Sequence, residues 1–309
     1  MTTAAQRIAR ARASFLHACR LDVAVPKPGN VSVASAGHGM QAQQFLASAQ
    51  AAVGPLFEPG AAVGERIEAA MAATWAAVGC NTNLGILLLC APVASAVEAD
   101  ESLHSPAALR AALQTVLAGL DTADASAAYR AIRLANPGGL GSAPEQDVHA
   151  APSLDLRAAM ALAAGRDRIA AQYAHGYADL FDLALPLLWP AYRLPADTDT
   201  DAEAEPPPPD AATTWLVRRT YLAVLGAFPD SHIVRKHGEG VAHTVMRAAQ
   251  ALRPGQAGCT ESALTEWDHS LKAQRINPGT SADLTAAALM LAGVLADVLA
   301  PPAGVWHGS

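Results

Sequence analysis

Aromatic residues are scarce in this 309-residue chain, at 5% of the sequence, although 51% of its residues are hydrophobic. Alanine and leucine supply most of the hydrophobic side chains, so the core must form by close packing of helices rather than aromatic-rich sheets. The chain also lacks β-type alternation, whereas hydrophobic residues recur at spacings of three and four. We therefore expect an all-α fold.

Cysteine and basic residues are also sparse or scattered. The four cysteines (19, 80, 90 and 259) form no CxxC pair and have no histidine at zinc-finger spacing, so we expect reduced core thiols. The formal net charge is −7, and no stretch concentrates lysine and arginine into a long basic stripe. This charge pattern argues against nucleic acid as a partner.

A secretory signal is not expected, because Arg7, Arg10 and Arg12 interrupt the place where its hydrophobic region would lie. The default location is the cytoplasm. Residues 69–97 lack charge, but the polar stretch 81–83 falls in their middle. We interpret this segment as a helix, a polar break and a second buried helix, rather than a membrane span.

The spacing of hydrophobic residues predicts about eleven helices. They are expected at 4–24, 41–53, 63–78, 84–98, 106–119, 122–135, 154–190 (broken), 211–226, 231–251, 260–273 and 281–299. Residues 195–210 contain six acidic residues, no basic ones and four consecutive prolines, which predicts a solvated loop. Because the helical pattern resumes after it, we expect one domain over 1–309 with 195–210 as an insertion.

The segment 25–40, VPKPGNVSVASAGHGM, interrupts the helical pattern. Its two prolines and Gly29 exclude a continuous helix, so it must be a structured loop that carries Lys27, Asn30 and His38. Loops of this kind often hold ligands, although a simple helix connector would explain the same residues.

A second break, CNTNLG at 80–85, joins two strongly apolar segments. Asn81 and Asn83 need hydrogen-bond partners if they are buried there. A ligand or metal could supply those partners, or the side chains could cap the helix that begins near Leu84.

The segment 228–240, FPDSHIVRKHGEG, is the richest polar cluster. Asp230 or Ser231 can cap a helix that places Ser231 with Arg235, and His232 with Lys236, four residues apart. Such a face suits phosphate, and Asp230 could hold Mg²⁺. The alternative is a solvated charged face. A zinc site is not expected, because His232, His237 and His243 do not share a helical face.

The last break is INPGTSADLTAA at 276–287. Asn277, Pro278 and Gly279 form a turn, Thr280 or Ser281 can cap the next helix, and Asp283 falls in its first turn. Taken alone, a helix cap explains every polar residue of this segment.

Five short motifs together resemble, in order, those of the triphosphoribosyl-dephospho-CoA synthase family, from about residue 15 to 300. They are PKPGNVS, GHGM, NTNLG, DSHIVRKHG and NPGTSADL. The resemblance implies an all-helical transferase that uses ATP and dephospho-CoA to make the precursor of the prosthetic group of citrate lyase or malonate decarboxylase carrier subunits. In that reaction a ribose hydroxyl of dephospho-CoA joins the ribosyl carbon of ATP, and adenine leaves.

The resemblance also implies roles for residues within the motifs. Lys27, Arg235 and Lys236 are candidates for binding phosphates, and Gly29 and Gly279 would permit close backbone approach. Asp230 and Asp283 are candidate Mg²⁺ ligands or general bases, and His38 and His232 are alternative bases. The residues expected to orient substrate or metal-bound water are Asn30, Asn81, Asn83 and Ser231.

Two positions depart from the family pattern. Members that make carrier-protein prosthetic groups have an Asp before the Met of the GHGM-like motif and His-Lys after Asn-Thr, whereas this chain has Gly39 and the pair Asn83-Leu84. The alternatives are therefore a related transferase that makes a pterin-type one-carbon carrier cofactor, or a nucleotide-binding protein without catalysis. In each case we expect the segments 25–40, 81–83, 230–236 and 276–283 to meet at one polar pocket.

Overall fold

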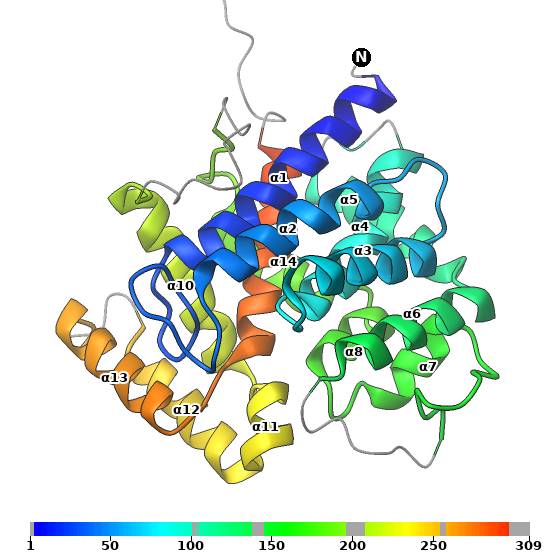
Figure 1. The fold of residues 1–309 in the computed structure, drawn as a ribbon. Helices are drawn as coiled ribbons and strands as arrows, with labels where there is room; N and C mark the ends of the chain where they lie inside the picture. The colour runs from blue at the N-terminus through cyan, green and yellow to red at the C-terminus, as the bar shows by residue number, and fades with distance from the viewer. Residues whose placement is uncertain are drawn as a thin grey trace, which may run out of the picture.

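The computed structural model describes residues 3–100, 103, 105–137, 145–195, 208–253 and 258–296. Within these ranges the chain forms α-helices and no strand, so the all-α prediction is confirmed (Figure 1). The helices are α1 (Ala4–Ala24), α2 (Ala42–Leu56), α3 (Val63–Val78), α4 (Leu84–Ala99), α5 (Pro106–Ala118), α6 (Thr122–Ala135), α7 (Leu156–Ala163), α8 (Arg168–Ala174), α9 (Leu185–Leu188), α10 (Ala211–Ala227), α11 (Ser231–His237), α12 (Glu239–Ala251), α13 (Glu261–Ala273) and α14 (Gly279–Leu295). A π-helical turn, Leu180–Ala184, precedes α9.

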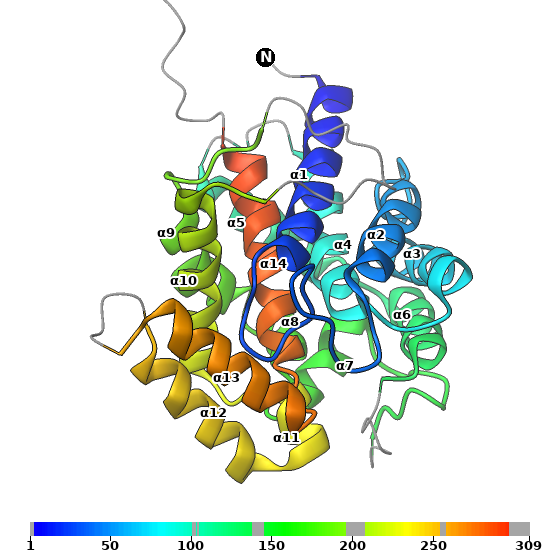
Figure 2. The same cartoon turned by 60° about the vertical axis from the view of Figure 1, so that its left-hand side comes forward.

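Helix α14 forms the centre of the fold. Its residues from 280 to 295 are all buried except Asp283, which is typical of a helix enclosed on every side. Helices α1, α4 and α10 pack against it, and Figures 1 and 2 show α1 crossing it. The two helices cross closely at Gly293, since a Cβ there would lie 2.8 Å from the Cβ of Ser14. Burial of α14 therefore fixes where its first turn lies.

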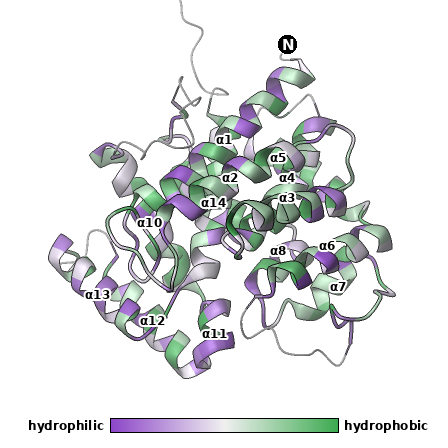
Figure 3. Ribbon diagram, in the orientation of Figure 1, coloured by the Kyte–Doolittle hydropathy of each residue, from purple (hydrophilic) through white to green (hydrophobic). Residues whose placement is uncertain are grey.

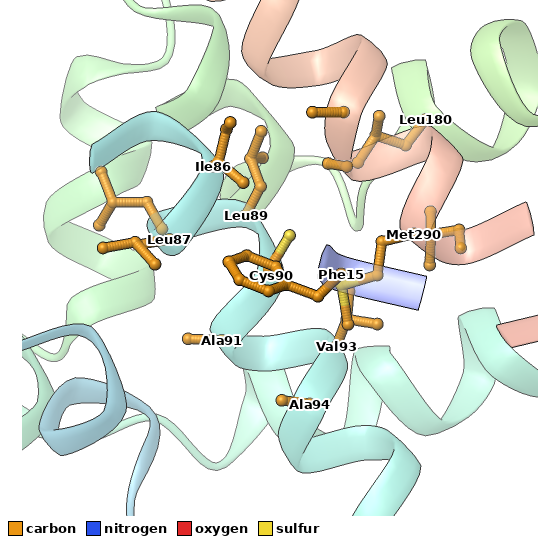
Figure 4. Close-up of a cluster of buried hydrophobic side chains, with 14 of the residues drawn as sticks. Phe15, Ile86, Leu87, Leu89, Cys90, Ala91, Val93, Ala94, Leu180 and Met290 are labelled. Atoms are coloured by element: carbon orange, nitrogen blue, oxygen red, sulfur yellow. The ribbon is translucent and has the colours of Figure 1, made fainter. Parts of the chain in front are cut away.

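Helix α4 is the second buried helix, and its neighbours supply the rest of the main core. Figure 4 shows its Cys90 beside Phe15 of α1, with Met290 of α14 in the same buried cluster. Hydrophilic residues, purple in Figure 3, are frequent on α11 and α13. The uncharged stretch is divided as predicted, because α3 ends at Val78 and α4 begins at Leu84. Among the described residues no helix is long and apolar enough to cross a membrane.

All four cysteines are free. Cys19 and Cys90 are buried, as expected for core thiols. The prediction was wrong for Cys80 and Cys259, which are only partly buried. Cys80 lies in the break between α3 and α4, and Cys259 lies just before α13, so neither is on a buried helix face.

The helix boundaries agree closely with the predicted ones, with one correction. The segment 231–251 is two helices, because Gly238 adopts φ +84° between α11 and α12. Periodicity alone does not reveal this break, since hydrophobic spacing continues across it. The predicted interruption of 154–190 is confirmed, because the segment is divided into α7, α8, the π-helical turn and α9, with φ +60° at both Gly176 and Tyr177.

The hydrophobic side chains form two clusters. The larger surrounds α4 and α14, and the smaller joins α10 to α13. Helices α10 and α14 contribute residues to both, so the clusters are connected. The single domain over 1–309 stays a prediction. Most of the predicted insertion at 195–210 lies outside the described residues.

Helix α3 approaches α6 so closely that only glycine fits at its second residue. A Cβ at Gly64 would lie 2.5 Å from the Cα of Asp124, and the Gly64 N–H donates to Asp124 Oδ1 at 2.7 Å. We predict that Gly64→Ala lowers the free energy of unfolding by about 1–3 kcal/mol, because backbone must move. Urea unfolding measures the change. The control is Gly240→Ala, at an exposed position of α12 where a Cβ meets nothing within 4 Å. Equal stability of the two variants would contradict this packing argument.

Candidate active site

One cavity of about 740 Å³ collects the polar breaks of the sequence. Its lining includes residues from the loop 25–40, the break 79–85, helix α11 and the first turns of α14. Helices α3, α6, α7 and α8 complete the wall. The structure thus brings together the four segments that were expected to meet. A volume of this size is typical of small-molecule sites.

The loop 25–40 is hydrogen-bonded both to α13 and to the turn between α13 and α14. The Asn30 side-chain amide donates to Asn277 Oδ1 at 3.2 Å, and the Gly29 N–H donates to Asp268 Oδ1 at 2.8 Å. Gly29 has φ +81°, and a Cβ there would lie 2.8 Å from Cδ of Pro278. The glycine therefore permits close approach to protein backbone and Pro278. It does not line the cavity.

Asp230 joins the first turn of α11 to the first turn of α14. Its Oδ1 accepts from the N–H groups of His232 and Ile233, at 2.9 and 3.2 Å. Its Oδ2 accepts from both the N–H and the hydroxyl of Ser281, each at 2.8 Å. The carboxylate is 2% exposed and does not line the cavity. The structure therefore gives Asp230 the role of a clamp between helices, which differs from the predicted role as metal ligand or base.

Helix α11 presents cationic side chains to the cavity, as its four-residue spacing predicted. Arg235 and Lys236 both line it. Nη1 of Arg235 donates to Asp167 at 2.7 Å, whereas its buried Nε has no hydrogen-bond partner. Lys236 is exposed. Ser231, in contrast, lies behind the lining, where its hydroxyl accepts from the N–H of Arg168 at 2.8 Å.

Two further carboxylates line the cavity besides Asp167, the partner of Arg235. They are Asp22, in the last turn of α1, and Asp283 of α14. Withdrawal from solvent raises the pKa of Asp283 well above its usual range, and the neighbouring Asp22 raises it further. A Cβ at Gly85 would lie 2.1 Å from Oδ2 of Asp283, so only glycine leaves space for this carboxylate.

Lys27 is buried rather than directed at a ligand. It is 1% exposed, its ammonium pairs with Oδ1 of Asp22 at 3.1 Å, and it does not line the cavity. It also donates to the main-chain carbonyl of Asp22. A buried charge requires such a partner. In this structure Lys27 positions Asp22, so its predicted contact with phosphate is not what the geometry shows.

Both candidate histidines line the cavity. Burial lowers the pKa of His38, whose Nε2 lies 2.8 Å from the carbonyl oxygen of Gly29. Burial, followed by the charges of Lys236 and Arg235, lowers the pKa of His232 to about 3. Nε2 of His232 has no hydrogen-bond partner. The neutral imidazole of His232 is therefore favoured at neutral pH.

The break before α4 contains both a cap and a site residue. Asn81 Oδ1 accepts from the N–H of Leu84 at 3.1 Å, which is the capping alternative. Asn83 is 4% exposed, its amide nitrogen donates to Oγ1 of Thr74 at 3.1 Å, and its Oδ1 has no partner. Both residues line the cavity, as does Gly279.

The sequence interpretation missed three kinds of cavity residue. Asp22 lies within an ordinary helical pattern, so nothing in the sequence marked it. Gly85 ends the NTNLG motif, but its contact with Asp283 depends on the packing of α4 against α14. Trp75 of α3 and Leu162 of α7 are 36% and 49% exposed and line the cavity. Exposed large hydrophobic residues could not be recognised without the fold.

The described residues contain no group of three or more His, Cys, Asp or Glu side chains placed to hold a metal ion. A site made only of such ligands, as zinc requires, is therefore absent from this part of the chain. Magnesium is different, because it is commonly bound by one or two carboxylates together with water and substrate phosphates.

The all-α fold thus surrounds one cavity that is lined by both cationic side chains and carboxylates. The sequence matches the family of ATP:dephospho-CoA triphosphoribosyl transferases over residues 8–299. The chain belongs to this family, and it is a transferase. The prediction of the family and of an enzyme is thereby confirmed, and the non-catalytic alternative is not favoured.

A crystal structure from Archaeoglobus fulgidus has the same fold. It is described as that of a candidate triphosphoribosyl-dephospho-CoA synthase and is 24% identical to this chain. The match has a TM-score of 0.62 and covers 81% of this chain and 99% of the other. No curated protein matches the sequence.

The clamp at Asp230 can be tested by its effect on stability. We predict that Asp230→Asn lowers the free energy of unfolding by about 1–3 kcal/mol, because an amide nitrogen then faces the buried N–H of Ser281. Asp210→Asn is the matched control, since exposed Asp210 caps only its own helix, α10, by accepting from Thr213. Thermal unfolding followed by circular dichroism measures both. A fall of the same size in both variants would show that the link to α14 contributes nothing.

Proposed function

We propose that this enzyme transfers the triphosphoribosyl group of ATP to a ribose hydroxyl of dephospho-CoA. Membership in the family supports this reaction. The observation that carries the proposal is the convergence of the family-like segments on one cavity with a cationic group, carboxylates and an apolar wall. ATP and dephospho-CoA both combine phosphate groups with a purine base, and such molecules need these surfaces. We also place the enzyme in the cytoplasm, where ATP is available and free cysteines persist.

The cationic side of the cavity is the proposed binding site for the triphosphate. Arg235 offers the unpartnered Nε of a planar guanidinium, and Lys236 adds an exposed ammonium on the next residue. Exposed Arg166, in the turn between α7 and α8, also lines the cavity. Phosphate oxygens accept strong charge-assisted hydrogen bonds from such groups.

The apolar wall is the proposed binding site for a purine base. Trp75 and Leu162 expose large side chains toward the cavity, and Phe45, Met40 and Met160 line it as well. An indole ring stacks on a purine with little loss of conformational freedom. The wall and the cationic side belong to one cavity, so a nucleotide can contact both.

The transfer breaks the glycosidic bond of ATP and forms a new bond from the acceptor hydroxyl oxygen to the same ribosyl carbon. Adenine leaves with the bonding electron pair and takes up a proton, while the hydroxyl loses one. We assign the acceptance of the hydroxyl proton to His232, because its neutral form is favoured and its Nε2 is unpartnered. Bound Mg²⁺ would offset the negative charge of the triphosphate.

Substitution of Arg235 tests the proposed contact with the triphosphate. We predict that the wild-type protein releases adenine from ATP only when dephospho-CoA is present, and that Arg235→Gln lowers kcat/KM roughly 10- to 100-fold, the loss expected for a hydrogen bond to a charged group. Adenine release is followed by chromatography. The control is Arg247→Gln, because the exposed side chain of Arg247 on α12 contacts Thr244. Unchanged kcat/KM in Arg235→Gln would place the triphosphate elsewhere.

Substitution of His232 tests its proposed role as acceptor of the hydroxyl proton. We predict that His232→Gln lowers kcat by roughly 10²- to 10⁴-fold with a smaller change in KM. In the wild type, kcat/KM falls only at strongly acidic pH, where His232, with its pKa of about 3, becomes protonated. In the enzyme–substrate complex, the bound triphosphate offsets the charges of Lys236 and Arg235 and so raises the pKa of His232. The acidic limb of the kcat profile therefore lies at higher pH than that of kcat/KM.

His237→Gln is the control, because His237 is on the same helix but outside the cavity lining. If His232→Gln keeps wild-type kcat and the same acidic limb, the proton acceptor is a different residue.

A further inference from the structure

Two asparagines that line the cavity have a buried amide oxygen without any hydrogen-bond partner. The oxygens are Oδ1 of Asn30, which is 5% exposed, and Oδ1 of Asn83, which is 4% exposed. Both residues line the cavity, although they come from different segments of the chain. A buried carbonyl oxygen without a partner destabilises the protein. Two of them on residues that line one cavity indicate that a ligand supplies the missing interaction.

The orientation of both amides is set by their nitrogen atoms. The Asn30 nitrogen donates to Oδ1 of Asn277, and the Asn83 nitrogen donates to Oγ1 of Thr74. Each oxygen is therefore the atom left for a ligand. An oxygen of this kind has only lone pairs to offer, so its partner must be a hydrogen-bond donor or a cation.

Asp22 and Asp283 add two carboxylates to the lining of the same cavity. Of the surrounding charges, Asp22 raises the pKa of Asp283 most. Asp283 makes no hydrogen bond or ion pair with the described residues, and its Oδ2 lies against Gly85, where the absence of a Cβ leaves room for it. Asp22 is held in place by buried Lys27. Carboxylates and unpartnered carbonyl oxygens together would repel a phosphate, so this part of the cavity is not an anion site.

We propose that Asp22, Asp283, Asn30 and Asn83 form an oxygen-lined site for one divalent cation of the Mg²⁺ type, bound directly or through water. Hard cations prefer oxygen ligands, and Mg²⁺ commonly uses one or two carboxylates while keeping several waters. Asp230, which the sequence suggested as a metal ligand, is not part of this site, because its two oxygens already accept four hydrogen bonds. A cation at Asp283 would also favour its ionised form, which burial disfavours.

The site lies in the cavity that Arg235 also lines, and Arg235 acts on the charge of Asp283. A cation between the carboxylates and the cationic residues would contact a triphosphate from the other side. This role of the cation rests on the proposed function. The ligand set does not, because it follows from the four side chains alone.

The test is Mn²⁺ binding to the full-length protein, measured by electron paramagnetic resonance without nucleotide and again with ATP. We expect one site per chain in the wild type. Asp283→Asn and Asn83→Leu should weaken binding at least roughly tenfold, whereas Asn83→Asp should bind as well as the wild type or better. Asp182→Asn is the control, since exposed Asp182 pairs only with Arg110.

Comparison with Asn83→Asp separates loss of a ligand from loss of folding. If Mn²⁺ binding is lost in Asn83→Leu but retained in Asn83→Asp, the position must supply an oxygen ligand. Wild-type Mn²⁺ affinity in both Asp283→Asn and Asn83→Leu would overturn the proposed site. Adenine release that persists in EDTA, without Mn²⁺ binding, would overturn the site and leave the transferase function intact. Variant-sensitive Mn²⁺ binding in a protein that never releases adenine would support the site and refute the proposed reaction.

Discussion

The buried carboxylate of Asp230 is the interaction on which the geometry of the site depends. It accepts four hydrogen bonds, two from the first turn of α11 and two from Ser281 of α14. Since α14 is enclosed by the core, the clamp fixes α11 against a rigid element. The cationic residues of α11 and the carboxylate of Asp283 consequently face the same cavity.

This arrangement places opposite charges around one cavity without pairing them all. Burial, followed by the lysine and arginine of α11, lowers the pKa of His232, while burial and Asp22 raise the pKa of Asp283. Both shifts favour the neutral form of the residue. Binding of a triphosphate with a cation would offset the contributions from neighbouring charges, because it brings negative charge to the cationic residues and positive charge to the carboxylates. The cavity is therefore suited to an anionic substrate that binds with a divalent cation.

The helices were predictable from sequence because alanine and leucine recur with helical spacing and because proline and glycine mark the breaks. The meeting of the polar breaks was also predictable, through the resemblance of the motifs. What could not be predicted was the direction of each side chain. Lys27 and Asp230 looked like ligands by residue type, yet the structure buries both in contacts with protein. Asp22 and Gly85 gave no sequence signal, because their roles arise only where α1, α4 and α14 meet.

The central claim is that one cavity holds the triphosphate and its cation between α11 and α14. The most direct test is a crystal structure of the protein with ATP and Mn²⁺, with anomalous diffraction used to locate the metal. The account predicts an anomalous peak beside Asp283 and Asn83, with the triphosphate between that peak and Arg235. A nucleotide bound outside this cavity, or a metal coordinated by other residues, would contradict it.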